Sequence, residues 1–286
     1  MARQLSLACL ALFPWIGTLP AQDAQDPPLV HGVVAVDLPS AYVFRGILQE
    51  DRELIVQPSL ELEATLFATE DEADTLRSLA LSFGQWNSIQ RGPTGHDAGD
   101  SWYEADLYAG LALGLGERFD VALQWARYAS PSGAWSAIEE LTFAVGYDDS
   151  ELLADGFAGL QPRVLVAREL VGQSDLGVAR GTYLELGIEP AFALGDEDAA
   201  WPITLALPVA VGLGLDDYYE SPTDGRDTRF GYLDVGLVLA APIGGADGSF
   251  EATLGVHVLA LGDATRDWND GEALRVVFAV GVAVAF

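Results

Sequence analysis

The last segment of the chain, residues 275–286, alternates between two kinds of side chain. Its sequence is RVVFAVGVAVAF. One parity holds bulky apolar residues and the other mostly small ones; the bulky ones are Val276, Phe278, Val280, Val282, Val284 and Phe286. Because successive side chains of a strand point to opposite faces, this pattern predicts a β-strand with one bulky apolar face. Such a strand fits either the core of a soluble sheet protein or the wall of a membrane barrel.

Segments with similar alternation recur about twelve times along the chain, near the length of about 9–11 residues with which tilted strands cross a bilayer. They cover residues 33–47, 54–66, 76–86, 102–113, 119–128, 138–147, 164–171, 183–194, 203–215, 230–241, 250–261 and 275–286. No long helical pattern interrupts them. We therefore predict an all-β fold, an antiparallel up-and-down transmembrane β-barrel of about 12 strands.

The connections between these segments alternate in length. Compact turns such as 114–118 alternate with longer polar connections such as 87–101 and 216–227. Outer-membrane barrels have short turns at one end and longer loops at the other. The pattern is imperfect, because 48–52 is short where a long loop is allowed and 150–159 is long where a turn is expected.

Charged residues of the predicted strands fall mainly on the face opposite to the large apolar side chains. A charge on the lipid face would cost about 2–4 kcal/mol near the bilayer midplane, so the charged face is expected to line the lumen. The candidate lumen-lining residues are Arg45, Glu61, Glu63, Glu104, Asp106, Asp120, Glu140, Glu185, Glu189, Asp234 and Glu251. Carboxylates in a pore favour cations over anions. The alternative is a filled interior in which these carboxylates pair with arginine, Tyr and Gln side chains.

Aromatic residues gather near the predicted strand ends. Tryptophan and tyrosine combine an apolar ring with a polar group, which suits the boundary between membrane and water. The candidate membrane-interface aromatics are Trp86, Trp102, Tyr103, Trp125, Tyr147 and Trp201.

Composition excludes several classes of partner. The formal net charge is -29, and all 14 basic residues are arginines, so a nucleic-acid partner is not expected because phosphate binding needs a basic surface. At the N-terminus, Arg3, an apolar run and Ala21 predict a signal peptide over residues 1–21, followed by a flexible lead-in over 22–32 and the barrel over 33–286. The one cysteine, Cys9, lies within the predicted signal peptide.

The sequence offers little sign of catalysis. His31, His96 and His257 are far apart and have no metal-ligand spacing, so neither a metal site nor a cofactor is expected. A hydrolase that uses His257 and a neighbouring hydroxyl is conceivable, but the sequence places no serine to match it. We expect no catalytic residues and no enzymatic activity.

Several segments resemble those of a known family. Residues 38–49 read LPSAYVFRGILQ, and WNS at 86–88, WYEADLYAG at 102–110 and the block at 140–148 follow. This part of the chain resembles the TorF-type porin family of bacterial outer-membrane barrels. The resemblance implies a location and a fold rather than a substrate, and it supplies no catalytic residues.

The expected function is therefore a porin-like barrel for passive diffusion of small solutes, with a preference for cations. After signal-peptide export it would lie in the outer membrane of a Gram-negative-type bacterium. The expected partners are outer-membrane lipid, small solutes including cations, and the barrel-insertion machinery, which would recognise the C-terminal strand ending at Phe286. The alternatives are a barrel with a sealed lumen that is structural or acts on lipids, and a soluble periplasmic β-sandwich.

Overall fold

The computed structural model of the chain is almost entirely β-structure. It describes residues 30–69, 71, 73–90, 101–150, 157–175, 177, 179–194, 202–243 and 250–286. The signal peptide predicted for residues 1–21 lies outside this part of the chain. The first strand, β1 (Val30–Pro39), begins slightly before the expected residue 33.

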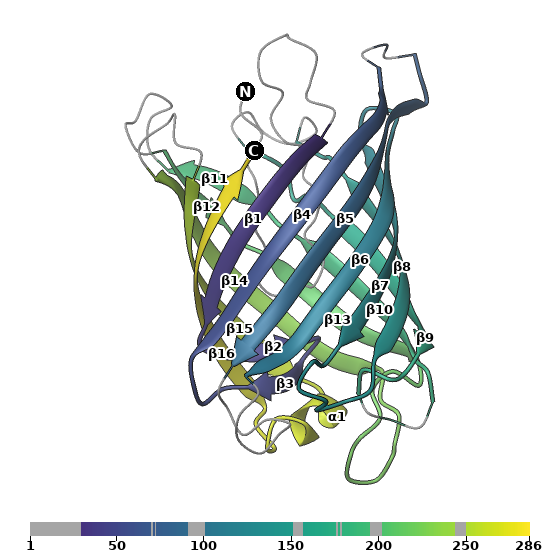
Figure 1. Cartoon of the computed structure of the whole chain (residues 1–286), viewed down its shortest axis with the longest axis vertical. Coiled ribbons are helices and arrows are strands. Elements are labelled where there is room, and N and C mark those ends of the chain that lie inside the picture. Colours follow the sequence, from purple (N-terminus) through teal and green to yellow (C-terminus); the bar gives the residue numbers. More distant parts are fainter. Residues whose placement is uncertain are drawn as a thin grey trace.

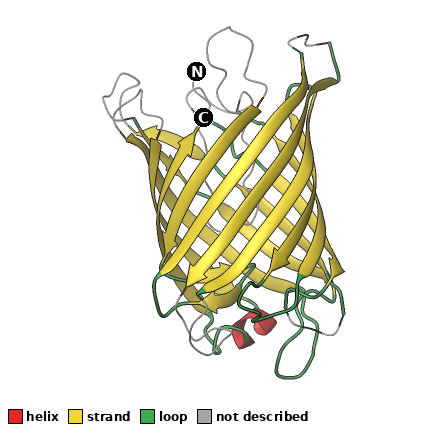
Figure 2. Cartoon of the chain, in the orientation of Figure 1, coloured by secondary structure: helices red, strands yellow, loops and turns green. Residues whose placement is uncertain are grey.

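The strands pair antiparallel with their neighbours and close into one barrel (Figures 1 and 2). The wall contains β1, β4, β5, β6, β7, β8, β9, β10, β13, β14, β15 and β16 in this order, and β16 pairs with β1 to complete it. Beyond β1, the bounds are β4 (Ile55–Ala68), β5 (Leu76–Gln90), β6 (Trp102–Leu115), β7 (Phe119–Ala129), β8 (Ile138–Tyr147), β9 (Arg163–Val171), β10 (Thr182–Ile188), β13 (Val209–Asp216), β14 (Phe230–Ile243), β15 (Phe250–Leu261) and β16 (Leu274–Ala285). The predicted barrel of about 12 strands is confirmed, and the β-sandwich alternative is wrong.

Two short strands continue the wall beyond proline breaks. β11 (Ala191–Leu194) follows β10 after Pro190, and β12 (Ile203–Ala206) precedes β13 across Pro208. Proline cannot donate to a strand ladder, so the ladder is interrupted at both points. β12 pairs with β11 and also with β14. The predicted segments 183–194 and 203–215 are therefore each one barrel strand with an interruption.

The two ends of the barrel differ. β1 begins and β16 ends at the upper end in Figure 1, which we call the terminal end. At the opposite end, which we call the loop end, lie β2 (Tyr42–Phe44), β3 (Ile47–Glu50) and the short helix α1 (Asp263–Asp267). Within the described residues, no helix is long and apolar enough to cross a membrane.

The outer surface of the wall carries large apolar side chains. Leu107, Phe143 and Phe278 are examples, with 44%, 49% and 57% of their surface exposed. The alternate positions are covered inside the barrel, as Asp106 and Gln124 show. A band of exposed apolar side chains around a barrel is what a lipid environment requires.

The first barrel strand is shorter than the sequence predicts. A strand was expected over 33–47, but β1 ends at Pro39 and the chain then enters β2 and β3, which form a two-stranded sheet of their own. The connection from β1 to β4 therefore covers residues 40–54, and the short loop expected at 48–52 is wrong. The period-two alternation continues through 41–44 because β2 is itself a strand, so periodicity could not reveal the break.

Candidate functional site in the barrel lumen

The β2–β3 hairpin lies inside the lumen at the loop end and contacts the wall on opposite sides. Ala41 and Val43 pack in a cluster with side chains from β8, β9, β10, β14, β15 and β16. Tyr42 and Phe44 pack in another, with side chains from β4, β6, β7 and β8. Successive residues of a strand point to opposite faces, so one short strand reaches across the barrel interior. The hairpin therefore obstructs the lumen at this end.

The tip of the hairpin has a strained backbone. Arg45 and Gly46 connect β2 to β3 with φ angles of 47° and 84°. A two-residue hairpin turn of this kind needs positive φ at both central positions, which glycine adopts freely. For a non-glycine residue such a conformation costs on the order of 1–3 kcal/mol, so it persists only where its surroundings hold it. An Arg-Gly pair between two short apolar runs is the sequence signal of this turn, and our sequence analysis missed it.

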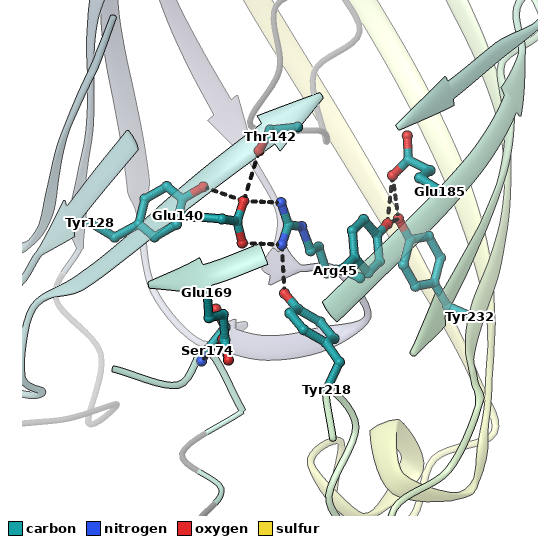
Figure 3. A network of polar contacts seen from close by, with 10 residues as sticks. Arg45, Tyr128, Glu140, Thr142, Glu169, Ser174, Glu185, Tyr218 and Tyr232 are labelled. Carbon is teal, nitrogen blue, oxygen red and sulfur yellow. Dashed lines mark hydrogen bonds and ion pairs between the residues drawn. The ribbon is translucent and has the colours of Figure 1, made fainter. Parts of the chain in front are cut away.

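The side chain of Arg45 is held by a buried network (Figure 3). Its Nη1 and Nη2 donate to the two carboxylate oxygens of Glu140 on β8, each at 2.7 Å. Nη1 also donates to the Tyr218 hydroxyl at 2.7 Å. Tyr128 and Thr142 donate to Glu140 Oε1 at 3.1 and 3.2 Å. Glu140 is fully buried, so the loss of either partner of this bidentate pair would leave a buried charge without compensation.

A tyrosine cluster adjoins this network. The guanidinium carbon of Arg45 lies 4.2 Å from the centre of the Tyr183 ring, within the range of a cation–π contact. The hydroxyls of Tyr183 and Tyr232 lie 2.7 and 2.9 Å from Glu185 Oε2. Figure 3 shows Tyr232 with its hydroxyl directed at Glu185, beside Arg45. The place of these tyrosines in the site could not be predicted from the sequence, because their partners are far away along the chain.

Two loops also hold the hairpin tip from the loop end. The Tyr219 hydroxyl, in the connection from β13 to β14, donates to the backbone oxygen of Arg45 at 2.9 Å. Asn269, just after α1, donates through Nδ2 to the backbone oxygen of Gly46 at 2.7 Å. Both side chains are buried. The tip is thus fixed at its backbone as well as at its charged side chain.

Glu104 and Asp106 lie beneath the other face of the hairpin. The Tyr42 hydroxyl donates to Glu104 Oε2 at 2.8 Å. Asp106 is fully buried, and neither of its carboxylate oxygens has a hydrogen-bond partner in the described part of the chain. These two acids therefore face the docked hairpin rather than open lumen.

On the terminal side of the hairpin, one stretch of the inner wall is a row of small residues. Ala80, Ala112, Ala122 and Ala144 lie side by side on β5 to β8, because each is the register partner of the next. Tyrosine rings occupy the corresponding volume at the loop end. Among the described residues, this row of alanines takes up less of the lumen than the tyrosines of the loop end do.

The terminal part of the lumen also carries acidic side chains. Glu61 and Glu63 on β4 and Glu251 on β15 lie on its wall. In the described residues, Glu63 Oε2 and Glu251 Oε1 have no hydrogen-bond partner. The inward Arg163 is already engaged by two other carboxylates. Acidic side chains of β4 and β15 therefore line the terminal half of the lumen.

The structure places the sequence-predicted lumen residues in three settings. Arg45 lies in the hairpin rather than on a barrel strand. Glu189 lies just after β10, where its carboxylate is 3.5 Å from Arg163. The remaining residues lie on the inward parity of the wall; these are Glu61, Glu63, Glu104, Asp106, Asp120, Glu140, Glu185, Asp234 and Glu251.

Three of the predicted interface aromatics lie on the outer surface. Trp102 and Trp125 are 48% and 37% exposed. Tyr147 is partly exposed at the end of β8 and contacts the Phe119 ring, with 4.9 Å between ring centres. Trp201 lies outside the described residues.

Trp86 and Tyr103 lie inside the barrel, so their prediction as interface residues is wrong. Trp86 packs against the Tyr42 ring of the hairpin, with 5.2 Å between ring centres. Tyr103 is buried, and its hydroxyl donates to Gln49 Oε1 at 2.6 Å. The inward hairpin supplies partners for aromatic rings in the lumen. A position near a strand end therefore does not identify an interface residue here.

A buried acid links two connections at the loop end. Asp175, between β9 and β10, accepts hydrogen bonds from the backbone amides of Gly177 at 2.9 Å and Glu220 at 2.7 Å. Burial raises the pKa of Asp175 to about 6 despite these bonds. When the two connections separate, Asp175 returns to its ordinary, lower pKa and releases its proton more readily. The contact between the connections is therefore stabilised as the pH falls through about 6, and the stabilisation is complete near the ordinary pKa of an aspartate.

We expect the contact between these two connections to be tighter at pH 5 than at pH 7.5. Hydrogen-exchange protection factors at the Gly177 and Glu220 amides measure it, and Asp175→Asn should abolish the difference. Asp224→Asn is the matched control, because Asp224 is exposed in the same β13–β14 connection. Equal pH dependence in wild type and Asp175→Asn would contradict this assignment.

His257 forms a buried pair with a carboxylate. Its Nδ1 lies 2.8 Å from Asp234 Oδ2, between neighbouring strands β15 and β14. His257 Nε2 has no hydrogen-bond partner among the described residues, so no serine or threonine of that part forms a relay with it. Nor does the described part contain a group of three or more His, Cys, Asp or Glu side chains placed to hold a metal ion.

Solved structures of similar shape are outer-membrane proteins. An outer membrane channel from Pseudomonas putida F1 is 14% identical, with a TM-score of 0.50, and the match covers 94% of this chain and 100% of that one. The chain has the fold of an outer-membrane β-barrel. The NanC porin is 9% identical, with a TM-score of 0.44 over 88% of this chain and 98% of its own. Outer membrane phospholipase A from Escherichia coli is 16% identical, with a TM-score of 0.44 over 92% and 94%.

Comparison of the sequence with known proteins does not assign the chain to a family. No protein-family model matches the chain, and no curated protein matches it either. Membership of the TorF-type family therefore stays a prediction.

Proposed function

We propose that this outer-membrane barrel is a channel for passive diffusion of small solutes, that it prefers cations, and that the β2–β3 hairpin gates its loop end. The observation that carries the proposal is the contrast along the lumen. The terminal half has a row of alanines and carboxylate oxygens without a hydrogen-bond partner among the described residues, whereas the loop half is closed by one hairpin whose tip is held through Arg45. A barrel needed only as a structural wall has no use for this difference.

The cation preference is expected to depend on the acids of the terminal half. Replacing Glu61, Glu63 and Glu251 together with Gln should move the cation-to-anion permeability ratio toward equality, because it removes fixed negative charge from the lumen. Reversal potentials under a salt gradient, recorded from the refolded protein in planar bilayers, measure this ratio.

Glu139→Gln is the matched control for that measurement. Glu139 lies on β8 next to the buried Glu140 but pairs with Arg127 on the exposed side of the wall. Its replacement removes one carboxylate without changing the lumen, so selectivity should be retained. An unchanged ratio in the triple variant would refute the role of the lumen acids.

A sealed barrel is the second candidate, and the buried Arg45–Glu140 network favours it. In this candidate the hairpin is a permanent plug and the protein acts structurally or on lipids. The sealed barrel would be favoured over the channel if folded and inserted protein carries no current, both in the wild type and in variants without the Arg45 contact.

We further propose that the chain reaches the outer membrane after removal of residues 1–21. The insertion machinery would recognise β16, which ends beside Phe286, and outer-membrane lipid would cover the apolar belt. Phe286 supports this by exchanging backbone hydrogen bonds with Gly32 on β1, each at 2.9 Å, which closes the barrel seam at the terminal end.

A further inference from the structure

A second polar site lies beside the hairpin tip, against the wall from β9 to β15. It is a cavity with hairpin residues Val43 and Gly46 on one side. Charged side chains line the other side, among them Arg163, Asp234 and His257. Asp234 and His257 belong neither to the Arg45–Glu140 network nor to the acids of the terminal half.

The unsatisfied atoms of this cavity are hydrogen-bond acceptors when His257 is neutral. A carboxylate only accepts, so the short contact from Asp234 Oδ2 fixes the proton of His257 on Nδ1. In the neutral ring, Nε2 is then an acceptor. Within the described part of the chain, neither Nε2 nor Asp234 Oδ1 has a partner, although His257 is 2% and Asp234 8% exposed. A ligand that satisfies both atoms must donate hydrogen bonds to them or coordinate them as a cation.

The histidine ring is held in a built position. A Cβ atom on Gly236, which faces His257 across the β14–β15 ladder, would lie 2.6 Å from the ring carbon Cε1 and 2.7 Å from Pro208 Cγ. Only glycine leaves room for the ring to lie against this strand. The orientation of Nε2 is therefore set by the wall and does not depend on a ligand.

The charges around the cavity determine whether it favours a cationic or an anionic ligand. Arg163 lies 3.3 Å from Glu185 and 3.5 Å from Glu189, so two carboxylates share its single charge. Arg45 is bound to Glu140. Asp234 therefore has no arginine of its own, and an anion would find no free cation here. A cation would also gain from the ring of Tyr232, which lines the same cavity.

We propose that this cavity binds a small organic cation that carries N–H groups, such as a primary ammonium ion, with Asp234 Oδ1 and His257 Nε2 as its acceptors. The cavity opens inside the lumen, so this site rests on the proposed channel function and names its preferred solute class.

The test compares two probes of equal charge, ethylammonium and tetramethylammonium, which has no N–H group. Isothermal titration calorimetry on the refolded barrel in detergent micelles measures binding without requiring conductance. We expect ethylammonium to bind at least tenfold more tightly than tetramethylammonium. Asp234→Asn and His257→Gln should each weaken ethylammonium binding about tenfold or more, the loss of roughly one directed contact. Heat-modifiable gel mobility checks that each variant is folded.

Glu139→Gln is the matched control, because it removes a carboxylate on the outer side of the wall and should leave ethylammonium binding unchanged. Equal affinity for the two probes, or full affinity in both cavity variants, would overturn the site. Cation-selective conductance without ethylammonium binding would reject this site and keep the channel. Binding by an electrically silent barrel would keep the site and reject the channel.

Discussion

Arg45→Ala is expected to unseat the hairpin and open the channel. The substitution leaves Glu140 buried without its cation, and removing one partner of a buried ion pair costs about 3–5 kcal/mol. A loss of about 3 kcal/mol shifts the balance between docked and undocked hairpin by roughly a hundredfold. Planar-bilayer recording should therefore show a large rise in open probability or in steady conductance over the wild type.

Arg127→Ala is the control for this result. Arg127 lies on β7 and pairs at 2.6 Å with Glu139, the neighbour of Glu140 in sequence, but this pair is partly exposed on the outer side. Exposed pairs contribute about 0–1 kcal/mol, so this variant should conduct like the wild type. Wild-type conductance in Arg45→Ala protein of normal folded mobility would show that the hairpin does not gate the barrel.

Leu111→Arg should strongly destabilise the inserted barrel. Leu111 is on the outer face of β6, with Leu81 and Leu123 as its register partners on either side, so its side chain is expected to face lipid. An arginine on that face costs about 2–4 kcal/mol near the bilayer midplane. Urea-unfolding titrations in lipid vesicles should show this loss in the free energy of unfolding.

Ala112→Arg provides the opposite case one residue further along. Its partners are Ala80 and Ala122 on the inner wall, where an arginine can reach the carboxylates of the lumen. We expect this variant to lose much less stability than Leu111→Arg. Similar losses for both substitutions, or no loss for Leu111→Arg, would contradict the assignment of the two faces.

The barrel wall was predictable because its constraint is local. Successive side chains of β8 and β15 face lipid and lumen in turn, and both strands match the predicted bounds 138–147 and 250–261. The same alternation placed Glu140 and Asp234 on the inner face. Where the wall departs from regular pairing, as at Pro190 and Pro208, the sequence still contained the residues that cause the break.

The interior was less predictable because its contacts join residues far apart in the chain. Arg45 and Tyr218 are 173 positions apart, and no period in the sequence connects them. The hairpin keeps the alternation of the strand before it, so it was counted as part of that strand. Trp86 was misplaced for the same reason, since only the folded-in hairpin gives its ring a partner inside the barrel.

The hairpin also sets an order of events during assembly. It directly follows β1, yet Asn269, which holds its tip, is 223 positions away from Gly46, and Arg275, which donates to Asp51 at 2.8 Å, is 224 positions away from that residue. Contacts of such long separation form late, because the intervening chain must first be arranged. Before the last strands have joined the barrel, the hairpin therefore lacks its hydrogen bonds to Asn269 and Arg275. The hairpin can therefore close the loop end of the lumen only after the barrel wall is complete.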